Sequence, residues 1–393
     1  MESRLVDGQT RAENEVRHKA VNRLAWLERA IVVSLVVGLL LSAKLWVSTR
    51  AYPLVPLLGF VPPLPYPLDY LLFALFTASL IGILIFRERL AGALAVAGLA
   101  LAVLLVLQDQ GRLQPWFYQY SFMLGAVGLS RLAQFPTESA LNACRVIVAS
   151  TYLWSGLQKA HVNFADSVYP WLIEPLASYL PSWAASPLEN GAYAVPVIEV
   201  AIGLGLLARP LRLLAVVGAI LMHAFILFTI GPWGHDWNLV VWPWNLAMVA
   251  FVLILFWRAP DNPSFIAVVK PGGSAFRAAV LVLFAFMPAL NFFGLWDSYL
   301  SASLYSGSIE EGYVYATGSP SAPPVRIIYT AMEEMNVSAY PEERVYKKVF
   351  AAMWCETTSS RLEPTLIVYG RPEILSGEHP STIYHCRDVR RHE

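Results

Sequence analysis

Three ionisable side chains inside long apolar segments are the residues of this sequence that could do chemistry: Lys159, Glu199 and His223. A charged group within a bilayer costs about 2.5–3.5 kcal/mol on insertion scales, so such residues point first to function. An amine, a carboxyl and an imidazole can exchange protons, and we interpret the three as catalytic candidates. The structural alternatives are a lysine that extends to the membrane interface and a Glu199–His223 hydrogen bond between packed helices.

The residues before Lys159 favour a binding face on the same helix. Tyr152, Ser155 and Gly156 share one helical face with Lys159. The small Ser155 and Gly156 leave room for a neighbouring helix or for a flat ligand. We therefore count all three as binding candidates.

A third group of polar residues follows in a Trp-rich segment. His235 and Asp236 stand next to each other at an expected membrane interface, and Asn245 lies deeper. A neutral histidine beside an aspartate can act as a general base near pH 7, or it can anchor a loop. We include His235, Asp236 and Asn245 among the binding candidates and keep both interpretations.

The elements that must position these residues are membrane helices. The 393-residue chain is 56% apolar and only 14% charged, whereas soluble proteins carry about 25% charged residues. Its net charge of zero argues against a nucleic-acid partner. Nine segments approach the roughly 20 apolar residues that a span requires: 30–47, 68–86, 90–107, 115–133, 139–160, 191–208, 211–231, 238–257 and 277–295.

These segments predict an all-α polytopic membrane helix bundle of about nine transmembrane helices over residues 30–295. Lys and Arg concentrate in residues 1–29 and in alternate loops, which predicts a multi-pass cell-membrane protein with a cytoplasmic N-terminal tail. The first segment is either an uncleaved anchor or part of a signal peptide, and we favour the anchor. Residues 296–393 would then form an extracytoplasmic domain.

The C-terminal domain reads as a small α+β unit. Residues 312–316, 365–369 and 382–386 are typical of strands, and 341–354 of an amphipathic helix. Cys355 and Cys386 both fall here, so outside the cytosol they would form a disulfide, the alternative being two free thiols. The sequence shows neither a metal-binding spacing nor a nucleotide-binding loop.

Two stretches also carry a family resemblance. YLWSGLQK at 152–159, followed by Asn163-Phe164, and PVIEV at 196–200 resemble the membrane domain of vitamin K-dependent γ-carboxylases, the horizontally transferred transmembrane (HTTM) type. The pattern also looks like DoxX-type membrane proteins, and the resemblance covers roughly residues 20–310. It implies that Lys159 is the base that starts oxygenation of a reduced quinone. Glu199 matches the family's acidic position, and His223 matches a family histidine loosely.

Two differences between this sequence and that family limit the activity that we expect. Gln158 stands where the family often has a second lysine, and the C-terminal domain is much shorter than the family's substrate-binding region. We therefore expect a quinone-coupled oxidoreductase or carboxylase-like enzyme with an outward-facing intramembrane site. The alternative is a non-enzymatic membrane module whose outer domain binds a protein partner. A transporter ranks third because no internal repeat is visible.

Overall fold

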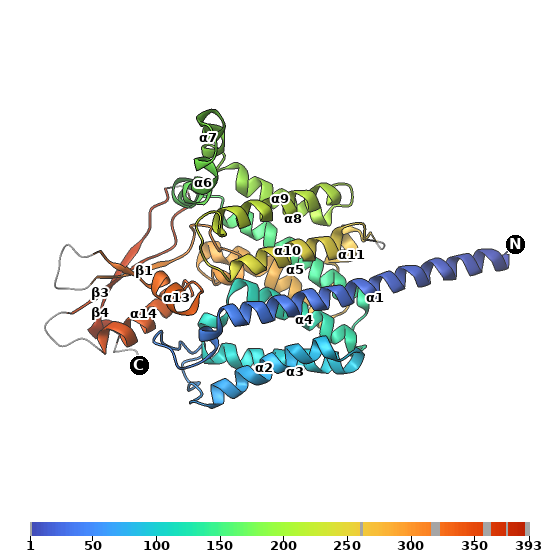
Figure 1. Cartoon of the computed structure of the whole chain (residues 1–393), viewed down its shortest axis with the longest axis horizontal. Coiled ribbons are helices and arrows are strands. Elements are labelled where there is room, and N and C mark those ends of the chain that lie inside the picture. Colours follow the sequence, from blue (N-terminus) through green and yellow to red (C-terminus); the bar gives the residue numbers. More distant parts are fainter. Residues whose placement is uncertain (1, 260–261, 316–322, 357–362, 375, 390–393) are drawn as a thin grey trace.

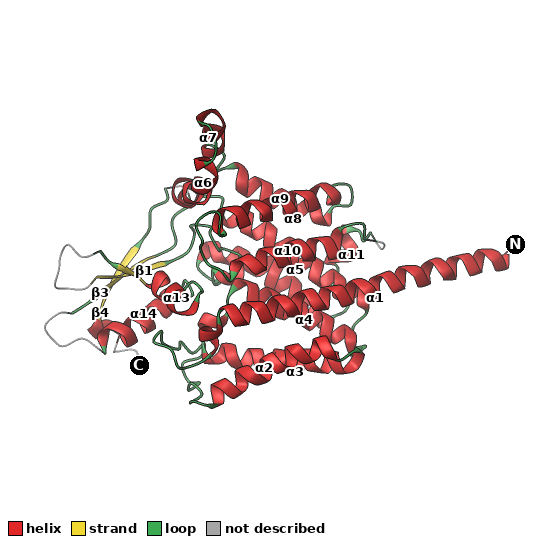
Figure 2. Ribbon diagram, viewed as in Figure 1, coloured by secondary structure: helices red, strands yellow, loops and turns green. Residues whose placement is uncertain are grey.

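The computed structural model of the chain describes residues 2–259, 262–315, 323–356, 363–374 and 376–389. Its helices run nearly parallel, with a small sheet at one end and the N-terminal helix projecting from the other (Figures 1 and 2). The long helices are α1 (Glu2–Leu41), α2 (Leu68–Ile85), α3 (Glu88–Gln108), α4 (Pro115–Arg131), α5 (Thr137–Gln158), α8 (Ala194–Leu207), α9 (Arg212–Ile230) and α10 (Val241–Phe256). A last bundle segment joins α12 (Ala275–Val280) to the irregular helices η4 (Leu281–Phe286) and η5 (Met287–Phe293).

Within the described part of the chain, five helical segments are long and apolar enough to cross a membrane. They are Glu15–Leu41, Leu68–Ile85, Glu88–Gln108, Arg212–Ile230 and Ala275–Phe293, and a bent pair made of α7 (Ser182–Glu189) and α8 would make a sixth. A helical membrane protein is thus supported, whereas nine spans are not confirmed. The other expected segments do form helices, but α4, α8 and α10 have 17, 14 and 16 residues, and α5 contains the polar residues of the site.

The expected boundary between an N-terminal tail and the first span falls inside one continuous helix. Helix α1 runs over 40 residues and ends at Leu41, where the short helix η1 (Ala43–Trp46) takes over. Glu28 and Arg131 form an ion pair of 2.8 Å that connects α1 to the end of α4. This pairing allows two charges to lie at the edge of the bundle.

The C-terminal domain contains a four-stranded antiparallel sheet in the order β2-β1-β3-β4. Its strands are β1 (Glu311–Tyr315), β2 (Val325–Arg326), β3 (Thr365–Tyr369) and β4 (Ser381–His385). Helices α13 (Ile327–Met335), α14 (Glu343–Phe350), η7 (Ala351–Cys355) and α15 (Cys386–Val389) accompany it. The three expected strands and the amphipathic helix are confirmed within a few residues, and β2 and α13 were not predicted. The expected Cys355–Cys386 disulfide is also present, with Cα atoms 5.5 Å apart.

The C-terminal domain and the bundle share one core. A single cluster of buried apolar side chains extends from the bundle helices to Val349 in α14 and Leu366 in β3. Polar contacts cross the same boundary, because the Glu334 carboxylate accepts hydrogen bonds of 2.6 Å from the backbone N–H groups of Ala51 and Tyr52. The domain therefore stands at a defined position on the helix ends.

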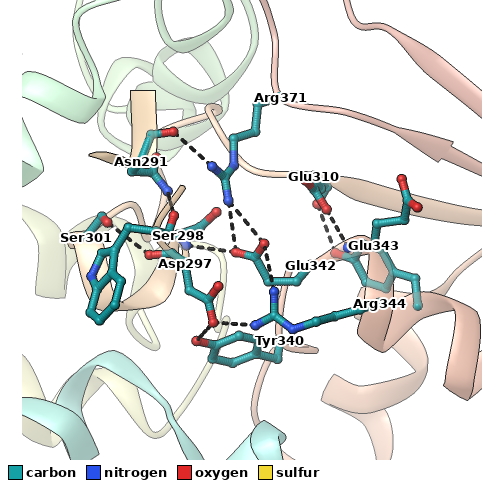
Figure 3. A network of polar contacts seen from close by, with 12 residues as sticks. Asn291, Asp297, Ser298, Ser301, Glu310, Tyr340, Glu342, Glu343, Arg344 and Arg371 are labelled. Carbon is teal, nitrogen blue, oxygen red and sulfur yellow. Dashed lines mark hydrogen bonds and ion pairs between the residues drawn. The ribbon is translucent and has the colours of Figure 1, made fainter. Parts of the chain in front are cut away.

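A buried polar network completes this junction (Figure 3). Arg371 donates to the Asn291 carbonyl oxygen at 2.8 Å and to both Glu342 carboxylate oxygens at 3.1 Å. Glu342 also accepts from the Ser298 backbone N–H at 2.8 Å. One guanidinium thus connects the end of the last bundle segment to the start of α14.

The same network contains a perturbed carboxyl group. Glu310 accepts a short hydrogen bond from the Glu343 backbone N–H. Burial raises the pKa of Glu310 to about 7, and the nearby negative charge of Glu342 adds to the increase. Glu310 therefore titrates in the neutral range, unlike an exposed glutamate.

Candidate functional site

A cavity of about 530 Å³ lies between α5, α8, α9 and α10. Its walls are largely apolar, and polar side chains enter it at a few points. On the side of the C-terminal domain it is bordered by a roof, which consists of residues of α6 (Tyr169–Ser178) and α7 together with Gly191, Ala302, Leu304 and Tyr305. A space of this size and lining suits a small ligand with a large apolar surface.

The most polar point of the cavity is an ion pair between α5 and α8. Lys159 Nζ lies 2.9 Å from Glu199 Oε2, and the two side chains are 8% and 5% exposed. The same amine donates to Ser155 Oγ at 2.5 Å and to the Ser155 carbonyl oxygen at 3.3 Å. All three hydrogen-bonding positions of the ammonium are therefore used, and its location at the C-terminal end of α5 suits a positive charge.

Two glycines allow α5 and α8 to approach closely enough for this pair. A Cβ atom at Gly156 would lie 2.7 Å from the Pro196 carbonyl oxygen, and one at Gly203 would lie 2.7 Å from the Leu153 backbone nitrogen. Both distances are shorter than real side chains tolerate, so only glycine fits at either position. The space at Gly156 is thus filled by the neighbouring helix, and it does not form part of the cavity wall.

A second polar group in the cavity consists of Tyr152, His223 and Asn245, from α5, α9 and α10. The Asn245 amide nitrogen donates to the Val241 carbonyl oxygen at 2.9 Å, so its oxygen faces His223 Nδ1 at 2.7 Å. In a neutral imidazole Nδ1 then bears the proton, and Nε2 accepts from the Tyr152 hydroxyl at 2.6 Å. The three side chains form a chain of hydrogen bonds that ends at a phenol in the cavity.

The structure brings six of the sequence-predicted site residues to this one cavity: Tyr152, Ser155, Lys159, Glu199, His223 and Asn245. It does not form the Glu199–His223 hydrogen bond that we considered as a structural alternative, because Glu199 bonds to Lys159 and His223 bonds to Tyr152 and Asn245. The reason is geometric. The rotation of each helix about its own axis determines which side chains come into contact, and the hydropathy of the sequence contains no information on that rotation.

The pair His235 and Asp236 does not line the cavity. His235 Nε2 lies 2.6 Å from the Trp171 carbonyl oxygen, and its ring stacks on the Trp171 indole with centroids 4.2 Å apart. Asp236 is exposed, and it adopts a left-handed backbone conformation with φ of 50°. Of the two interpretations open for His235, the contacts favour the loop anchor.

Sequence reasoning missed the roof and most of the apolar wall residues. Tyr169 and Leu172 of α6 and Leu188 of α7 line the cavity, as does Trp244 of α10. The Trp-rich composition of this region was visible, but only the fold shows that α6 packs against α9 and that α6 and α7 both reach the cavity. In the described ranges, no three His, Cys, Asp or Glu side chains gather in a way that could hold a metal ion.

Comparisons with known proteins add no relative. No family model matches the chain, and neither the curated proteins nor the solved structures contain a match.

The arrangement offers two ways to handle a proton. The Lys159–Glu199 pair can exist as ammonium and carboxylate or, after transfer of one proton over 2.9 Å, as amine and carboxylic acid. The low polarity of the surroundings reduces the advantage of the charged form. The second way is the Tyr152 hydroxyl, which can pass its proton to His223 Nε2, the atom to which it is already hydrogen-bonded.

Proposed function

We propose that this protein is a membrane enzyme that binds a reduced quinone in the cavity and removes a proton from its hydroxyl group. The observation that supports the proposal is that a buried Lys–Glu pair and a Tyr–His–Asn chain line the same apolar cavity of about 530 Å³. A quinol matches this cavity, because its flat ring and its tail are apolar and its two oxygen atoms could bind at the two polar groups. The resemblance to the γ-carboxylase membrane domain, whose matching lysine is a base, supports the same ligand.

The proposed step is one proton transfer. The quinol O–H bond breaks, and its proton moves to the Lys159–Glu199 pair, which then holds an ammonium and a carboxylic acid. The phenolate that forms stays beside the ammonium, which stabilises its charge within the low-polarity cavity. The Tyr152 hydroxyl, whose own proton is donated to His223, would accept a hydrogen bond from the second hydroxyl group of the quinol.

The topology that we propose with this function is the one that the loop charges indicate. The N-terminus is cytoplasmic, all nine apolar segments cross the cell membrane, and the C-terminal domain is extracytoplasmic. The roofed side of the cavity then faces outward. Helices too short or too polar to span alone place their polar side chains against neighbouring helices, as Lys159 and Glu199 do, which lowers the cost of these groups.

The non-enzymatic module predicts polar groups that only hold helices together. Lys159 and Glu199 do pair, but they also line a cavity with His223, and helix packing alone does not require that space. A partner-binding role of the C-terminal domain has no specific contact in its favour, so we rank it second.

The test uses purified protein in nanodiscs and a short-tailed ubiquinol under anaerobic conditions. Quenching of tryptophan fluorescence reports binding, since Trp244 lines the cavity, and the ultraviolet absorbance of the quinolate reports deprotonation. We expect Lys159→Met to bind the quinol within a few-fold of wild type but to form at least about tenfold less quinolate, as loss of a general base typically does. Lys19→Met, which alters an exposed Lys–Glu pair, is the matched control.

Equal quinolate formation by wild type and Lys159→Met would remove the catalytic assignment. Absence of quinol binding by the wild-type protein would reject the ligand and favour the non-enzymatic module. Glu199→Gln serves as a second variant if Lys159→Met does not fold.

A further inference from the structure

The hairpin made of α6 and α7 is oriented differently from the spans. Helix α7 meets α8 at an angle of 67°, and it projects sideways from the bundle at the end that holds the C-terminal domain (Figure 1). Because α8 runs with the bundle axis, a helix at this angle lies closer to the membrane plane than to its normal. This is the geometry of an interfacial helix.

The surface of the hairpin carries exposed aromatic side chains. No residue of α7 is buried, and Trp183 is 78% exposed. Tyr179 and Tyr193, just before and after α7, are 70% and 63% exposed. Tyr and Trp are the residues that concentrate at membrane–water interfaces, where an apolar ring and a polar edge are both accommodated.

The charges of the hairpin indicate which kind of lipid it fits. Residues 160–190 contain no Lys or Arg and three acidic residues, Asp166, Glu174 and Glu189. Attraction to anionic lipids therefore cannot hold the segment at a membrane. Its contact with lipid must rest on the aromatic rings, so zwitterionic lipids are sufficient.

The same hairpin forms part of the cavity roof. Tyr169 and Leu172 of α6 and Leu188 of α7 line the cavity, and the Tyr169 hydroxyl donates to the Leu188 carbonyl oxygen at 2.5 Å, which holds the two helices together. A Cβ atom at Gly191 would lie 2.8 Å from that hydroxyl. One face of the hairpin is thus in contact with the cavity, while Trp183 is exposed on its surface.

We propose that the α6–α7 hairpin is a lipid-binding surface, which lies in the membrane interface at the C-terminal-domain end of the bundle and covers the cavity there. Its partner is the head-group region of zwitterionic phospholipid. The hairpin then lies between the cavity and the lipid head groups at this end of the bundle. This inference does not depend on the proposed reaction, since it concerns where the roof lies.

The experiment places a fluorescent NBD label at Trp183→Cys in a Cys144→Ala background, in nanodiscs that hold one copy of the protein. Cys355 and Cys386 form a disulfide and do not compete for label. Val103→Cys, on a 59% exposed position of α3, is the lipid-contact control. Ser381→Cys, exposed on β4, is the aqueous control.

We expect the label at 183 to be quenched about two-fold by phosphatidylcholine brominated near the head of its acyl chain, as burial at the interface requires. The label at 381 should be unaffected, and the quenching at 183 should not change with salt or with added anionic lipid. Quenching at 183 no greater than at 381 would overturn the proposal, and so would quenching that appears only with anionic lipid. Tyr179→Cys repeats the test if the first label disturbs folding.

Discussion

Removal of one partner of the Lys159–Glu199 pair leaves the other buried and uncompensated. The two side chains are 8% and 5% exposed and their charged atoms are 2.9 Å apart, so water cannot replace the lost partner. Loss of one member of a buried pair costs about 3–5 kcal/mol. We therefore expect Lys159→Met and Glu199→Gln each to lower the free energy of unfolding by an amount in this range.

The double variant distinguishes the interaction energy of the pair from the effects of the surroundings on each residue. Lys159→Met with Glu199→Gln leaves no buried charge, so its loss of stability should be smaller than the sum of the two single losses, with a coupling of about 2–3 kcal/mol. Reversible unfolding in mixed micelles of increasing SDS content measures all four proteins of the cycle. Lys19→Met is the matched control, because Lys19 and Glu15 are 54% and 66% exposed, and its change should stay below about 0.5 kcal/mol. Additive losses from the two single variants would refute the reasoning.

Three further changes test other parts of the fold. Gly156→Ala pushes a Cβ against the Pro196 carbonyl oxygen at 2.7 Å and should cost about 1–3 kcal/mol, whereas Gly218→Ala, with its nearest contact at 3.4 Å, should change the melting temperature little. Cys386→Ser opens a loop between residues 31 apart and should cost about 3–4 kcal/mol in the unfolding transition of the C-terminal domain. The pKa of Glu310 is raised in the folded protein to about 7 from the ordinary 4.5, so its protonated form favours the fold. This contribution is complete below pH 4.5 and is lost as pH rises through about 7, and Glu310→Gln should flatten the pH dependence of the melting temperature over that interval.

The elements of the C-terminal domain could be predicted because their signals are local. Strand β3 at Thr365–Tyr369 and the apolar stripe of α14 each stand in a few consecutive residues. Strand β2 has two residues, too few for an alternating pattern to appear. Its pairing with β1 also depends on residues that are not adjacent in the sequence, and hydropathy contains no information on such pairs.

For the candidate site, the types of residue could be predicted and their pairing could not. A lysine or a glutamate in an apolar stretch is conspicuous because its cost depends on local composition. Its partner depends on the depth and rotation of two helices, which here follow from Gly156 and Gly203 and their contacts with Pro196 and Leu153. A small residue in a sequence does not indicate which helix will pack against it. The Tyr152–His223 contact could not be predicted for the same reason.

The helix that contributes most of the polar side chains of the site is one that does not qualify as a span by itself. Helix α5 has 22 residues, yet it is absent from the five apolar segments found in the described chain. It holds the buried Arg145, whose guanidinium donates to the Leu255 carbonyl oxygen at 3.1 Å and to Asn142 Oδ1 at 2.6 Å, and then Tyr152, Ser155 and Lys159. A helix so polar is stable within a membrane only where neighbouring helices satisfy its side chains, and here α8, α9 and α10 do so. The low hydropathy of a long helix therefore indicates this site better than any single residue does. It identifies the helix whose polar side chains need partners on neighbouring helices.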